Sequence, residues 1–132
     1  MKYTDINSYE LACKDQGRDP DARPDYSKYG FTPAQERYHN SVFEFDIISI
    51  SVNKEDGKKW KPTPDDRRYS VWVNIYDDSS KRSGFGVSFG DVFYEGSASL
   101  VASRLTFRDA KRAKHMFDKF PNLYEDILIP QF

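Results

Sequence analysis

The sequence predicts a mixed α+β fold, in which an antiparallel meander sheet of three strands, with room for a fourth, is covered on one face by two or three helices. Helix caps and helical spacing mark both ends of the chain. Between them, three segments rich in β-branched and aromatic residues follow one another without a helix pattern. The predicted order is therefore α-α-β-β-β-α. A chain of 132 residues has the size of one domain, so we predict a single domain over residues 1–132.

A short helix over residues 7–16 is predicted first. Asn7 can cap its free N–H groups, and Glu10 stands three positions later, where a capping box places an acid. Gly17 supplies the left-handed residue that commonly ends a helix. The following segment, 17–31, is rich in Gly, Pro, Asp and Ser and is predicted to be a loop.

A longer helix is predicted over residues 33–53. The run Thr32–Gln35 combines a capping residue, a proline at the first helical position and a glutamine that completes the capping box. Apolar side chains then recur every three or four residues, as on one helix face: Tyr38, Val42, Phe45, Ile48 and Val52. Residues 45–52 are also rich in β-branched side chains and could form a strand, in which case the helix would end near Phe43. The length of the pattern and the cap favour one helix.

Three strands and a final helix are predicted in the second half of the chain. Residues 69–76 alternate between two faces, and residues 85–93 alternate bulky side chains with glycine and serine. The glycines of this second strand indicate close approach by another backbone or by an aromatic ring. Residues 99–107 form the third predicted strand, and a helix over 109–128, kinked at Pro121, completes the fold.

The composition excludes several classes of protein. No run approaches the roughly 18 apolar residues that a membrane span needs, and the first residues contain no apolar core of a signal peptide. The single cysteine, Cys13, excludes an internal disulfide and a multi-cysteine zinc site. We therefore expect a cytoplasmic protein without membrane association. Acidic and basic side chains interleave as on a solvated surface, although residues 57–132 carry 13 basic and 10 acidic side chains and could face a phosphate backbone.

The most informative cluster combines aromatic rings with basic side chains around the first predicted strand. Its members are the candidate binding residues Trp60, Arg67, Arg68, Tyr69, Trp72 and Arg104. Rings beside Arg and Lys on an open sheet can stack unpaired bases, each worth about 1–3 kcal/mol. The alternative is that helices cover these rings. We favour it because the chain has few other core residues and an exposed stacking face would thin its core. Arg104, if it faces inward, needs a carboxylate or a ligand phosphate as its partner.

Motifs for catalysis and for cofactors are weak. Residues 86–90 match the G-x-S-x-G pattern around Ser88, but a nucleophile elbow needs a helix directly after it, and residues 91–94 do not start one. His39 and His115 lack the spacing of metal ligands, and the glycines lack the spacing of a phosphate loop. We therefore predict no catalytic, cofactor-binding or metal-binding residues and no cofactor.

Several short motifs spread from about residue 9 to residue 129 form a recognisable pattern. They are Gly17-Arg18-Asp19-Pro20, Pro24-Asp25, Trp60-Lys61-Pro62, Tyr69 with Trp72, Gly84-Phe85-Gly86 with Ser88, Ser103-Arg104-Leu105 with Phe107, and Leu123-Tyr124. Through them the chain resembles small proteins of unknown function encoded by phages, prophages and mobile elements of gut Bacteroidetes. These relatives often have Pro where this chain has Val71, and commonly have Gly where it has Lys59. The resemblance implies a phage or mobile-element origin, a place in the host-cell cytoplasm and a helix over residues 33–53, and it implies no activity.

The sequence thus favours a non-enzymatic accessory protein of a phage or mobile element that binds a protein partner through an exposed aromatic patch. Two alternatives stay open. The first is a single-stranded nucleic-acid binder that uses the sheet aromatics with Arg and Lys. The second is a small serine hydrolase that uses Ser88 and His115.

Overall fold

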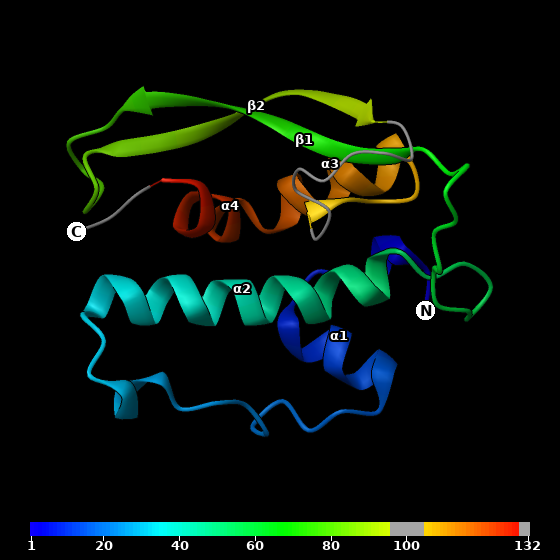
Figure 1. The fold of residues 1–132 in the computed structure, drawn as a ribbon, viewed down its shortest axis with the longest axis horizontal. Coiled ribbons are helices and arrows are strands. Elements are labelled where there is room, and N and C mark those ends of the chain that lie inside the picture. The colour runs from blue at the N-terminus through cyan, green and yellow to red at the C-terminus, as the bar shows by residue number, and fades with distance from the viewer. Residues whose placement is uncertain (96–104, 130–132) are drawn as a thin grey trace.

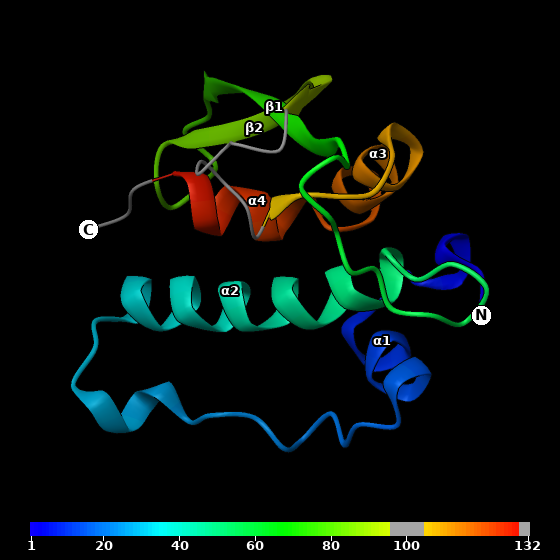
Figure 2. The same ribbon diagram turned by 45° about the vertical axis from the view of Figure 1, so that its right-hand side comes forward.

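The computed structural model describes residues 1–95 and 105–129 and shows a mixed α+β fold. Its regular elements are α1 (Tyr9–Gln16), α2 (Pro33–Val52), β1 (Arg68–Asp77), β2 (Phe85–Glu95), α3 (Ala110–Lys119) and α4 (Pro121–Leu128), with 3-10 turns at Tyr3–Asp5 and Tyr26–Tyr29. Three layers lie on one another in Figure 1: the sheet, then α3 with α4, then α2. The helix α1 packs on the far side of α2 (Figure 2). One face of the sheet therefore meets helices, and its other face points away from all the described helices.

The described residues form a two-stranded antiparallel sheet, so the predicted meander of three or four strands is wrong for this part of the chain. Most of the predicted third strand, 99–104, lies outside the described residues. Phe107, at the end of that segment, makes one isolated bridge to β1 through hydrogen bonds of 2.9 and 2.7 Å. The backbone beside it is held by a side chain instead, because the Asn53 carboxamide donates to the Thr106 carbonyl and accepts from the Arg108 N–H. A residue at the end of α2 thus binds the Thr106 carbonyl, which lies within the predicted third strand.

The predicted final helix, 109–128, is two helices, so the order α-α-β-β-α-α replaces the predicted one. They separate at Phe120, whose φ of −130° and ψ of 48° leave the helical path. Pro121 has no N–H to donate to α3, and it starts α4 in the first turn, where no donor is needed. Asp109, the first residue of the predicted helix, caps α3 and accepts a hydrogen bond of 2.8 Å from the Arg112 N–H.

The first helix, α1, is capped one residue later than expected. Ser8, and not Asn7, is the cap: its Oγ accepts a hydrogen bond of 3.1 Å from the Leu11 N–H. Gly17 ends the helix with a φ of 66°, the left-handed conformation that its position predicted. A capping serine and a left-handed glycine therefore set the bounds of this short helix.

The second helix, α2, starts on the predicted capping box. The Gln35 N–H donates to Thr32 Oγ1 at 3.2 Å, and the Thr32 N–H donates to Gln35 Oε1 at 2.8 Å. Residues 45–52 are helical, so the prediction of one long helix is confirmed and the strand alternative is wrong. None of the described helices is long and apolar enough to cross a membrane.

The long loop between α1 and α2 is held on the helices by Arg23. Its guanidinium lies over two rings, 5.0 Å from the centroid of Tyr9 and 5.5 Å from that of Phe43. It also pairs with Glu44 at 2.8 Å and donates to Asn40 Oδ1 at 3.3 Å. Two rings, one carboxylate and one carboxamide thus hold one guanidinium. We call these four residues and their arginine the Arg23 site.

The C-terminal ends of α1 and α2 are joined by a polar clamp. Ser51 Oγ donates to Asp15 Oδ2 at 2.7 Å, and Lys54 Nζ lies 3.0 Å from the same oxygen. Burial alone would raise the pKa of Asp15, but hydrogen bonds from Ser51 and Lys54 and the charge of Lys54 outweigh it and lower that pKa. The ionised carboxylate therefore stabilises the packing of α1 on α2.

We expect Asp15→Asn to lower the free energy of unfolding at pH 7 by about 1–2 kcal/mol, because a hydrogen-bonded, largely buried charge is lost while Lys54 stays in place. The folded-state pKa is the lower one, so this stabilisation is present above the unfolded value of about 3.9 and disappears as the pH falls through the folded value. Urea unfolding at pH 7 and pH 3 should show the difference between wild type and variant shrinking at low pH. Glu10→Gln, at an exposed position of the same helix, is the control. An Asp15→Asn effect of equal size at both pH values would contradict the assignment.

Candidate functional site

The face of the sheet opposite the helices carries three large aromatic side chains. Alternation along the paired strands places on this outer face the residues Ser70, Trp72, Asn74 and Tyr76 of β1 and Gly86, Ser88, Asp91 and Phe93 of β2. Trp72 is 61% exposed, Tyr76 45% and Phe93 37%. An antiparallel sheet usually turns polar side chains to water, so rings of this size on the solvent side stand apart from the normal pattern.

Two of these rings lie directly against glycines of the neighbouring strand. A methyl group on Gly90 would lie 2.7 Å from Cδ1 of Trp72, and one on Gly86 would lie 2.5 Å from Cζ of Tyr76. The prediction that the glycines mark close approach by a ring is therefore confirmed. A ring held in this way is already ordered, so it loses little conformational freedom when a partner covers it.

A shallow hollow of about 400 Å³ opens on the outer face between Trp72 and Phe93. We call it the outer hollow, and its lining residues are Trp72, Asn74, Gly90, Asp91, Val92 and Phe93. The centroids of the two rings are 6.4 Å apart and their planes meet at 80°, so one ring stands upright beside the other. The strand register shifts between Trp72 and Val73, a β-bulge that sets the position of Asp91 across from Trp72.

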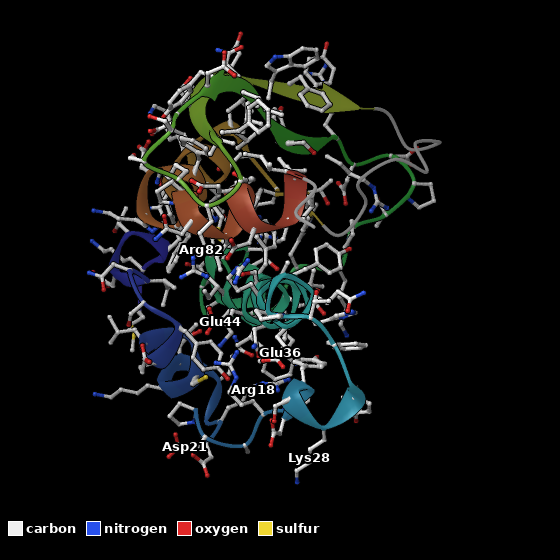
Figure 3. The ribbon with its side chains drawn as sticks, turned by 90° about the vertical axis from the view of Figure 1, so that its left-hand side faces the viewer. Arg18, Asp21, Lys28, Glu36, Glu44 and Arg82 are labelled. Carbon is white, nitrogen blue, oxygen red and sulfur yellow. The ribbon has the colours of Figure 1, made fainter. Side chains whose placement is uncertain are left out.

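The charge of the outer hollow is negative. The side chain of Asp91 is exposed, and its Oδ1 accepts a hydrogen bond of 2.7 Å from the Val92 N–H. No cation of the described residues forms an ion pair with it. By alternation along β1, Arg68 belongs to the same face as Trp72. Its side chain is half-buried, however, and its Nε is shielded from solvent. Arg82, in the loop between the strands, lies below the sheet on the side of the helices (Figure 3).

The structure separates the five candidate binding residues that it describes. Trp72 lies on the outer face, so the interpretation that helices cover the strand rings is wrong for it. Tyr69 is half-buried on the inner face, with its ring 5.9 Å from that of Tyr94. The Arg67 guanidinium lies 4.4 Å from the centroid of the same Tyr94 ring. Arg104 lies outside the described residues.

Trp60 and Trp72 do not share a hollow. Trp60 is half-buried in the loop before β1, in a second hollow of about 420 Å³ that Lys58, Lys59 and Lys61 also line. Acidic side chains line that hollow as well, and one of these carboxylates already forms an ion pair with an arginine that lines the same hollow. Within the described residues, the two tryptophans therefore belong to two separate hollows.

The structure does not bring Ser88 and His115 together. Ser88 is exposed on the outer face, whereas His115 belongs to α3 on the opposite side of the sheet. His115 Nε2 lies 2.8 Å from the Ile6 carbonyl, and its ring stands edge-on to Tyr3. His39 is stacked in a cluster of aromatic rings. Within residues 1–95 and 105–129, no group of three His, Cys, Asp or Glu side chains is placed to hold a metal ion.

Sequence reasoning did not single out the other residues of the outer hollow. Alternation alone places Asn74 on the same face of its strand as Trp72. Asp91 and Phe93 join them only through the register of the hairpin and the bulge between Trp72 and Val73. The signals in the sequence that pointed to this place were the candidate residue Trp72 and the glycines of the second strand.

We expect Gly90→Ala to destabilise the protein by about 1–3 kcal/mol, because the added methyl group would meet both Cδ1 and, at 2.9 Å, the backbone carbonyl oxygen of Trp72. Gly86→Ala is the matched comparison. Its methyl group would meet only the far end of the Tyr76 ring, which can swing outward, so its cost should be smaller. Urea unfolding of both variants measures the difference. Equal losses would show that Trp72 is not held against Gly90.

Comparison with protein-family models, with curated proteins and with solved structures finds no match to this chain. The functional argument therefore rests on the geometry of the outer face.

Proposed function

We propose that this chain is a non-enzymatic binding protein and that its outer face docks a protein partner. The observation that carries the proposal is the exposure of Trp72, Tyr76 and Phe93 on one face of a short sheet. Two of these rings, Trp72 and Phe93, lie side by side, and Trp and Tyr are the residues that most often carry the binding energy of protein interfaces. Their contact with the glycines of β2 supplies the order that such an anchor needs.

The charges favour a protein over a single-stranded nucleic acid. A surface that stacks bases sets its rings beside Lys and Arg, which follow the phosphates. On the outer face the carboxylate of Asp91 takes that place beside Trp72, and Arg67 is engaged with Tyr94. Nucleic-acid binding is therefore the second candidate, and it is tested by the same experiment.

The resemblance to proteins of phages, prophages and mobile elements adds a proposal about the partner. On that origin, the partner would be a protein of the element or of its host cell. The outer face would then act in the host cytoplasm as an accessory surface without chemistry of its own.

We expect a photo-crosslinking residue at Ser88, on the outer face, to capture a discrete protein partner in lysate of cells that carry the gene. The same crosslinker at Glu10, exposed on α1 beyond α2, is the matched control and should not capture it. Trp72→Ala should reduce capture at least tenfold, because an interface tryptophan contributes about 2 kcal/mol or more. Since Trp72 is 61% exposed, the same change should alter the free energy of unfolding by less than about 1 kcal/mol.

The outcomes of this experiment separate the candidates. Capture that survives nuclease treatment supports a protein partner. Capture of labelled mixed-sequence oligonucleotides at Ser88, weakened by salt, would favour the nucleic-acid alternative. Equal capture from Ser88 and Glu10, or capture that ignores Trp72→Ala, would overturn the proposal.

The hydrolase alternative makes a separate prediction. Because Ser88 and His115 lie on opposite sides of the sheet, we expect no reaction of Ser88 with a fluorophosphonate probe. Mass spectrometry of the labelled chain measures it, with Ser88→Ala as the control. Stoichiometric labelling at Ser88 would contradict a non-enzymatic role.

A further inference from the structure

The outer hollow combines four groups that together recognise one kind of side chain. Its walls are the rings of Trp72 and Phe93, and its polar lining comes from the carboxylate of Asp91 and the carboxamide of Asn74. We propose that the outer hollow binds an arginine side chain of the partner protein. This inference rests on the proposed function, and it names what the partner must present.

The rings supply the first part of the recognition. A cation over the face of an aromatic ring is attracted by the electrons of the ring, and indole is the strongest of the natural acceptors. None of the described Lys or Arg side chains lies over Trp72, which is 61% exposed. Its contact with Gly90 fixes the ring before any partner arrives.

The carboxylate supplies the second part. Asp91 is exposed, and among the described residues its side chain accepts one hydrogen bond, from the N–H of its own neighbour Val92, so it keeps capacity for a charged donor. No cation of the described residues neutralises it. The Asn74 carboxamide, whose Nδ2 lies beside Gly90, also lines the hollow, and a carboxamide carries a neutral acceptor oxygen as well as a donor. A partner that covers the hollow must therefore bring a positive charge, because an unpaired buried carboxylate would cost more than the rings gain.

The Arg23 site gives a precedent within the same chain. There, a guanidinium lies over the rings of Tyr9 and Phe43 while it pairs with the carboxylate of Glu44 and donates to the carboxamide of Asn40. The outer hollow presents the same set of groups: two rings, one carboxylate and one carboxamide. The difference is that none of the described basic side chains occupies it. The same chemistry points to an arginine from another molecule.

Arginine fits this set better than lysine does. Its planar guanidinium can stack on a ring and at the same time donate two parallel hydrogen bonds to a carboxylate, whereas the lysine ammonium acts as a point charge. The hollow is shallow and open, which suits a side chain inserted from a docked surface. Stacking and pairing act together only when ring and carboxylate lie side by side, as the register of the hairpin places them.

The test uses N-acetyl-arginine amide as the probe and the Trp72 indole N–H resonance as the readout. The chain has two tryptophans, so Trp60→Phe leaves Trp72 as the only indole signal. We expect a saturable shift in the millimolar range with the arginine amide, and binding at least tenfold weaker with N-acetyl-citrulline amide, which has nearly the same shape without the charge. The lysine amide should fall between the two.

The matched pair of variants is Asp91→Asn and Asp77→Asn. Asparagine at 91 can still accept from the Val92 N–H, so the bulge is kept while the charge is removed. We expect Asp91→Asn to weaken binding of the arginine amide at least fivefold and Asp77→Asn, exposed at the end of β1, to leave it unchanged. Equal binding of citrulline and arginine amides, or an Asp91→Asn variant that binds arginine amide as wild type does, would overturn the proposal.

Failure of this inference can be told from failure of the proposed function. If Ser88 captures a partner that Trp72→Ala loses, while arginine amide leaves the indole signal unmoved, the outer face docks a protein and the arginine site is wrong. If arginine amide binds and Asp91→Asn abolishes it, while no protein is captured at Ser88, the arginine site stands and the docking role fails.

Discussion

One chain of aromatic rings connects the layers of this molecule. Phe45 of α2 stands edge-on to Tyr124 of α4 at 5.3 Å, Tyr124 meets Phe117 of α3 at 5.4 Å, and Phe117 meets Phe89 of β2 at 5.8 Å. Edge-to-face and tilted contacts at these distances add to the burial of the rings themselves. A polar chain with few aliphatic residues can therefore form a core, but only while all four elements keep these rings in register. Burial raises the pKa of the Tyr124 hydroxyl, which stays protonated at the centre of this core.

The same constraint explains why rings also stand on the outer face. The ring chain needs only the inner face of the sheet, through Phe89 and the valines around it. The outer rings therefore add nothing to this core, although they have the size and shape of core residues. Gly86 and Gly90 also lower the stability of a strand, because glycine loses more conformational freedom on folding than any other residue. Without side chains, these two glycines leave space for the rings of Tyr76 and Trp72, and this packing supports the proposed binding role of the outer face.

Capping residues and helical periodicity predicted the helices from the sequence. The features that were predicted wrongly or missed depend on contacts between residues far apart in the chain. The capping box at Thr32–Gln35 acts within one turn, so it can be seen in the sequence and is present in the structure. The segment that ends at Phe107 has strand-like residues, but Asn53, more than 50 positions earlier, binds the carbonyl of Thr106 within it. The outer hollow could not be predicted as a whole for the same reason, because it depends on pairing between two strands. Asp91 meets Trp72 only through pairing of two strands whose register a bulge changes, and no periodicity within either strand reports it.

The pairing of ring and carboxylate decides what kind of molecule can cover the outer face. A phosphate backbone laid over Trp72 would bring negative charge to Asp91, and the repulsion would grow as the hollow lost its water. A neutral apolar surface would bury that carboxylate without a partner, which costs more than stacking on the rings would gain. A guanidinium avoids both penalties, because it is weakly hydrated, stacks on the ring and neutralises the charge. The Arg23 site shows that this chain already uses that solution to hold its own loop on its helices. By the same physics, a cationic protein surface is the cover that the outer hollow can accept.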